Sequence, residues 1–155
     1  MCIQPVNNFN YQYPKTPVVI QPAAGRNYCC FNQAKTDYFV KQKELGLPYL
    51  KEVLKNSKNE DQITESLYIL DRMIEGGTKG VEKMYPVLSR FNNSRSPNIQ
   101  TFLAGIYRKI QVPDAFGPLV SMLIQNSLNP QPSVFDPNEE IGGAILSYLS
   151  DRFRG

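Results

Sequence analysis

The stretch Ser96–Ile110, with the sequence Ser-Pro-Asn-Ile-Gln-Thr-Phe-Leu-Ala-Gly-Ile-Tyr-Arg-Lys-Ile, is the clearest amphipathic segment of this 155-residue chain. Its apolar residues Ile99, Leu103, Ile106 and Ile110 follow one another at steps of four, three and four. That spacing places them on one side of an α-helix. Because Ser96 is suited to cap this helix and Pro97 to occupy its first position, we predict a helix over residues 97–110.

Two other segments repeat this spacing, and each has a proline-containing segment before it. The same steps occur at Ile63, Leu67, Leu70 and Ile74, and in weaker form at Ile141, Ile145 and Tyr148. The preceding prolines are Pro48, Pro86 and Pro118, each followed two residues later by Leu or Val. The pattern indicates a repeated unit of a proline-containing helix, a polar turn and a striped helix, which buries its apolar side against neighbouring units.

The boundaries of the other helices follow from capping and stop signals. We predict a first helix over residues 36–56, capped by Thr36 or Asp37 and bent or split near Pro48. Asn59 with Gln62 resembles a capping box for a helix over 60–75, which Gly76 and Gly77 end. The remaining predictions are a helix capped by Thr78 that continues past Phe91, a helix around 116–124, and a last helix capped by Asn138 that reaches Phe153.

This arrangement resembles the HEAT and armadillo family of α-solenoids over residues 36–153. The resemblance implies an all-α fold: a short α-solenoid of about six helices, paired as HEAT-like hairpins, with the second helices on the concave side. The chain differs from HEAT repeats at the turns between paired helices, which hold Asn56, Ser94 and Asn126 where those repeats often have Asp. A single compact helical bundle is the alternative architecture.

Residues 1–34 differ in composition from the remainder and are predicted to be a flexible arm, disordered or loosely docked, before a helical domain over 35–155. The arm is rich in Asn, Gln and Pro, and its charges are Lys15 and Arg26 alone. The cysteines Cys2, Cys29 and Cys30 are an odd number and predict no disulfide framework. We see neither a secretory signal nor a membrane-length apolar run, so we expect a cytoplasmic protein without a membrane partner.

Histidine, the commonest general base near neutral pH, is missing. Its absence excludes Ser-His and Cys-His nucleophilic sites and most zinc sites. The adjacent acids Glu60–Asp61 and Glu139–Glu140 lie where helices are predicted to start, so they are best explained by the helix dipole. We therefore predict no metal or cofactor and no enzymatic activity; an enzyme that uses buried carboxylates is the weaker alternative.

We predict a non-enzymatic adaptor or scaffold that binds a protein or peptide along the face of its stacked hairpins. The candidate partner-binding residues are Tyr68, Arg72, Tyr107, Arg108, Lys109 and Phe135. The alternative is binding of a nucleic-acid backbone, which requires cations that converge on one side of the molecule. The cations available for it are Lys79, Lys83, Arg90, Arg95, Arg108 and Lys109. The sequence leaves the oligomeric state open.

Overall fold

The computed structural model describes residues 18–19, 30–130 and 136–153, and its body is α-helical, as predicted. The helices are α1 (Gln33–Gln42), α2 (Leu47–Asn56), α3 (Glu60–Glu75), α4 (Tyr85–Leu88), α5 (Pro97–Ile110), α6 (Phe116–Leu128) and α7 (Asn138–Phe153). Two short strands, β1 (Val18–Val19) and β2 (Cys30–Phe31), pair antiparallel. Most of the predicted arm, residues 1–34, lies outside the described residues.

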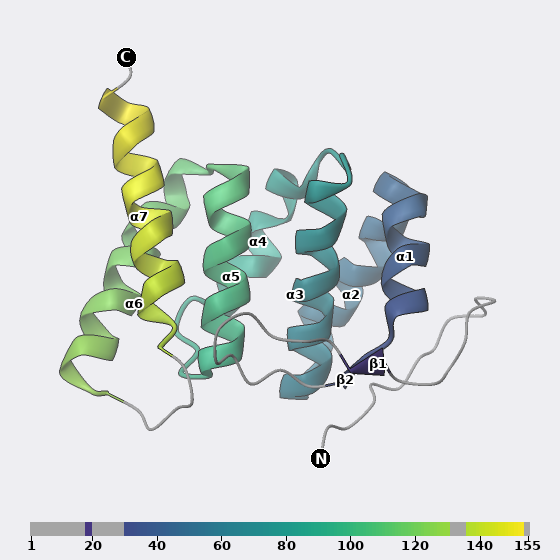
Figure 1. The fold of residues 1–155 in the computed structure, drawn as a ribbon, viewed down its shortest axis with the longest axis horizontal. Helices are drawn as coiled ribbons and strands as arrows, with labels where there is room; N and C mark the ends of the chain where they lie inside the picture. Colours follow the sequence, from purple (N-terminus) through teal and green to yellow (C-terminus); the bar gives the residue numbers. More distant parts are fainter. Residues whose placement is uncertain (1–17, 20–29, 131–135, 154–155) are drawn as a thin grey trace.

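The helices form two layers (Figure 1). One layer contains α1, α3, α5 and α7 side by side, and α2, α4 and α6 lie behind it. Helix α5 is central because it packs against α3 on one side and against α7 on the other. The last pair, α6 and α7, packs together at one end of the molecule. None of the helices in the described ranges is both long and apolar enough to cross a lipid bilayer.

Each of the three aligned prolines lies in the first turn of an α-helix rather than in its middle. Pro48 and Pro86 are the second residues of α2 and α4, and Pro118 is the third residue of α6. A 3₁₀ turn precedes each of these helices, at Lys43–Gly46, Val81–Met84 and Pro113–Ala115. Proline is tolerated in a first turn because its missing N–H would have no helical partner there. The predicted split of the first helix near Pro48 is therefore confirmed.

Capping confirms some predicted boundaries and corrects others. The side chain of Asn59 accepts from the N–H of Gln62 at the start of α3, and Ser96 caps α5, both as predicted. The predicted cap of the first helix, Thr36 or Asp37, is wrong, because Asn32 caps α1 through the N–H of Lys35. In place of the predicted single helix after Gly77, the chain forms a 3₁₀ turn at Val81–Met84, the short α4 (Figure 1) and a second 3₁₀ turn at Ser89–Phe91.

The predicted apolar stripes form the core. Leu67, Leu70, Leu103 and Ile106 are fully buried between the two layers, and Ile63, Ile99 and Ile141 are also buried. Tyr148 of α7 contacts the carboxyl end of the neighbouring α5, where its hydroxyl lies 2.9 Å from the carbonyl oxygens of both Tyr107 and Val112. The spacing that identified the striped helices is thus the spacing that fills the interior.

A buried ion pair joins α1 to α3. Lys35 Nζ lies 2.9 Å from Glu65 Oε1, and the two side chains are 7% and 1% exposed. The backbone N–H of Asn32 also donates to Glu65 Oε2, at 3.4 Å. Two donors from the start of α1 therefore converge on one carboxylate in the interior, so this pair fixes where the chain enters the helical body.

Candidate functional site

Tyr68, predicted as a partner-binding residue, is covered by another part of the same chain. Its ring stacks on Phe31 with centroids 4.9 Å apart and meets Phe102 edge-on at 5.8 Å. Phe31 is fully buried, although the sequence analysis assigned it to the arm. Burial raises the pKa of the Tyr68 hydroxyl. The segment that enters α1 therefore occupies the surface around Tyr68.

Tyr107 does not lie on the surface, and this corrects its predicted placement. It is fully buried, and its hydroxyl donates to Asn92 Oδ1 at 2.5 Å. The reason is the central position of α5, in which every residue from Ile99 to Tyr107 is buried. A helix that packs against neighbours on both sides buries side chains on more than one of its faces.

The charged candidates at the carboxyl ends of α3 and α5 form ion pairs with neighbouring acids. Lys109 Nζ lies 2.5 Å from Asp71 Oδ1 and 2.7 Å from Glu75 Oε1. Arg72 pairs with the same Glu75. Arg108 is exposed on α5 and lies close to Gly143 of α7. Phe135, the remaining candidate, lies outside the described residues. This network links α3 to α5 and neutralises Lys109 and Arg72 locally.

The cations considered for nucleic-acid binding lie at opposite ends of the helices. Arg90 donates to the carbonyls of Leu54 and Ser57, near the end at which α3 begins. Lys109 lies near the end at which α3 finishes, since it contacts Glu75. Arg95 precedes α5, whereas Lys109 is in its last turn, so the length of that helix, about 20 Å, separates them. Arg90 and Arg95 therefore lie at one end of the helices, and Lys109 lies at the other.

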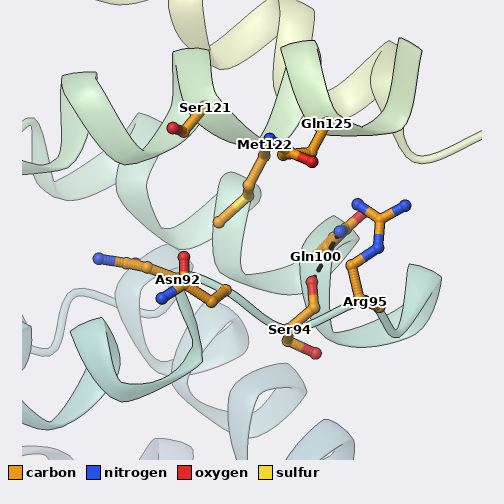
Figure 2. A pocket seen from close by; sticks show the side chains of 8 residues that line it. Asn92, Ser94, Arg95, Gln100, Ser121, Met122 and Gln125 are labelled. Atoms are coloured by element: carbon orange, nitrogen blue, oxygen red, sulfur yellow. Dashed lines mark hydrogen bonds between the residues drawn. The ribbon is translucent and has the colours of Figure 1, made fainter. Parts of the chain in front are cut away.

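A pocket of about 270 Å³ lies between the segment before α5 and one side of α6 (Figure 2). Its walls are mostly amides and hydroxyls, with one cation and no acid; the lining residues are Asn92, Asn93, Ser94, Arg95, Gln100, Ser121, Met122 and Gln125. Figure 2 shows Ser121, Met122 and Gln125 coming from one helix and Asn92, Ser94 and Arg95 from the chain opposite. Sequence reasoning missed this pocket, because no spacing pattern connects its two walls.

Hydrogen bonds within the chain hold the polar wall of the pocket. Gln100 Nε2 donates to the carbonyl of Ser94 at 2.7 Å, and Asn126 Nδ2 donates to Gln100 Oε1 at 2.9 Å. Arg95 donates to Asn126 Oδ1 at 3.1 Å and to the carbonyl of Asn129 at 2.8 Å. These partners of Arg95 are neutral, and they use two of its five N–H donors. The remaining N–H donors of the guanidinium carry the one positive charge among the residues that line the pocket.

Within the described part of the chain, no group of His, Cys, Asp or Glu side chains could hold a metal ion. Gly77, with a φ value of 95°, ends α3, and its N–H donates to the carbonyl of Ile74; Gly80, with a φ value of 88°, precedes the next 3₁₀ turn. The groups that line the pocket offer hydrogen bonds and one positive charge, that of Arg95.

Comparison with known proteins adds no family. No protein-family model matches the chain. No curated protein and no solved structure matches it significantly.

The two buried tyrosines predict that the protein loses stability at high pH. Burial raises the pKa of Tyr148 to about 12, and burial also raises the pKa of Tyr107. An unfolded tyrosine ionises near pH 10. Between about pH 10 and 12 the unfolded state therefore binds fewer protons than the folded state, so the free energy of unfolding falls as pH rises.

Urea unfolding at a series of alkaline pH values measures this loss. We expect Tyr148→Phe to make the dependence on pH shallower, because phenylalanine cannot ionise in the unfolded chain. Arg108→Gln, which changes an exposed residue of α5, is the control, and its free energy of unfolding should depend on pH as steeply as that of the wild type. Equal slopes for wild type and Tyr148→Phe would contradict the assignment.

Proposed function

We propose that the protein is a non-enzymatic adaptor, a short HEAT-like α-solenoid that binds an extended acidic peptide in the pocket between α6 and the segment before α5. The observation that carries this proposal is the composition of the pocket: four amide side chains and two hydroxyls surround it, with Arg95 as its one charge. The two helical layers support the solenoid assignment, because each striped helix packs against its neighbour along the chain.

Amide side chains suit an extended peptide because each offers a donor and an acceptor, as a peptide bond does. Asn92 and Gln125 lie on opposite walls, so a peptide between them can pair with both. Met122, which is buried, provides an apolar floor. A carboxylate of the peptide is the partner for Arg95, because the planar guanidinium binds a carboxylate through two parallel hydrogen bonds.

Nucleic-acid binding, the alternative, has less support. Its candidate cations lie at both ends of the helices, and Arg90 and Lys109 already have partners within the chain. A phosphate backbone requires several neighbouring cations to displace its counterions. The residues that line the pocket include one cation, Arg95.

Selection from a random-peptide display library tests the proposal. We expect enriched peptides to share an Asp or Glu, and to bind Arg95→Gln at least tenfold more weakly than wild type by fluorescence polarisation. Added salt should weaken binding to the wild type more than to the variant.

The matched control is Arg108→Gln, which removes the same charge from α5 outside the pocket. It should bind the selected peptides as the wild type does, and thermal unfolding checks that both variants fold. Peptides without a shared acid, or an equal loss of binding in both variants, would overturn the proposal.

A further inference from the structure

The outer side of the last helical pair is apolar and lacks a covering element among the described residues. It is formed by Val120, Leu123 and Ile124 of α6 and by Ile145, Leu146 and Leu149 of α7, which we call the end face. Ile124 is 50% exposed and Leu146 is 65% exposed, and the other four are half-buried. We propose that a second copy of this chain covers the end face, so that two chains form a symmetric dimer.

Equivalent positions in the preceding units show what this surface is suited to contact. Alignment on the prolines makes Val120 and Ile124 the counterparts of Leu50 and Leu54 in α2. Leu50 and Leu54 are completely or almost completely buried, and the carbonyl of Leu54 accepts from Arg90 of the next unit. The end face therefore has the composition of an inter-unit contact, and none of the described residues completes it.

The α7 part of the end face is also less buried than the equivalent positions in the preceding units. Ile145 occupies the stripe position of Leu67 in α3 and Leu103 in α5, both fully buried. Ile145 remains only half-buried. Two independent helices thus present apolar positions on the side of the molecule that faces away from α5.

The distribution of charged residues favours a second copy that contacts the end face through its own end face. Residues 115–135 and 141–150 include no Lys, Arg, Asp or Glu, so the end face has no charge with which to select a charged partner. Its apolar composition is complementary to itself. At the other end of the molecule, α1 and α2 expose the charged residues Asp37, Lys41, Lys51, Glu52 and Lys55. Head-to-tail stacking would bury these charges, whereas a two-fold contact joins apolar surface to apolar surface.

The area of the end face is compatible with such a dimer. Helices of 13 and 16 residues are about 20 Å and 24 Å long. Packed side by side they offer about 500 Å² per chain, at the lower limit for a specific interface.

Sedimentation equilibrium between about 1 and 100 µM, where an interface of this size associates, tests the proposal. We expect the mass to rise with concentration from 17.6 kDa, the mass of one chain, toward twice that value. Ile124→Lys and Leu146→Lys should each weaken association at least tenfold, because each buries a charge in the contact. Both positions are exposed in the single chain, and far-ultraviolet circular dichroism checks that the variants fold.

Leu45→Lys is the matched control, because Leu45 is 81% exposed and lies in the 3₁₀ turn before α2. It should associate as the wild type does. A protein that stays monomeric at 100 µM, or a dimer that both end-face variants leave intact, would overturn the proposal.

Spin labels distinguish the two arrangements. In a variant whose three cysteines are replaced by serine, a nitroxide at Ser150→Cys should lie close to its copy in the dimer, by pulsed electron paramagnetic resonance. A nitroxide at Lys51→Cys in α2 should lie far from its copy. The opposite result would place the contact at α1 and α2 and refute the end-face dimer.

Discussion

Substitution of Lys35 by methionine is expected to lower the free energy of unfolding by about 3 to 5 kcal/mol. The reason is the Glu65 carboxylate, which is 1% exposed and would lose its charged partner without gaining access to water. The backbone N–H of Asn32, at 3.4 Å, would remain as its other donor. Urea unfolding of the two proteins at neutral pH measures the difference.

Two controls separate the ion pair from the general effect of removing a lysine. Lys41→Met changes an exposed lysine in the same helix and should alter stability by no more than about 0.5 kcal/mol. The double variant Lys35→Met/Glu65→Met removes both charges and should regain most of the loss, because an apolar pair of similar volume replaces a buried ion pair at little cost. A double variant as unstable as Lys35→Met alone would contradict this explanation.

Replacement of Tyr107 by alanine is the second large effect, with an expected loss of about 3 to 5 kcal/mol. The side chain is fully buried in the helix that contacts both α3 and α7, so its removal leaves a cavity at the centre of the molecule. For a chain of this size the melting temperature should fall by roughly 10 °C, which scanning calorimetry measures.

Tyr107→Phe isolates the contribution of the hydroxyl. That variant keeps the ring and loses the bond to Asn92 Oδ1, so the expected loss is about 1 kcal/mol. Equal losses for Tyr107→Phe and Tyr107→Ala would show that the hydrogen bond, and not the packing of the ring, carries the stability.

The helices were predictable from the sequence because their signals are local. The four-three-four spacing and the caps Asn59 and Ser96 act within a few residues of each other, and the structure confirms the helices over 60–75 and 97–110. The cap of α1 was missed because Asn32 was grouped with the polar arm. A single Asn resembles its neighbours in composition until the helix that it caps is known.

The buried ion pair between Lys35 and Glu65 and the pocket both depend on contacts between residues that are far apart in the sequence. No local sequence pattern indicates such contacts. Lys35 and Glu65 are 30 residues apart, and each is an ordinary surface residue by type. Tyr107 was expected on the surface because a stripe analysis assumes one buried side for each helix, whereas α5 has neighbours on two sides. The pocket walls, near Ser94 and near Gln125, meet only after α6 has packed.

The contrast between the two ends of the molecule has a consequence for how such a chain can lengthen. Duplication of a hairpin after α7 would place new apolar side chains against Ile124 and Ile145, which need no change to receive them. Insertion before α1 would instead require the exposed Lys41 and Lys51 to be replaced first. The α6–α7 side of the described body therefore offers apolar surface to a further helical hairpin, whereas the α1–α2 side offers charged surface.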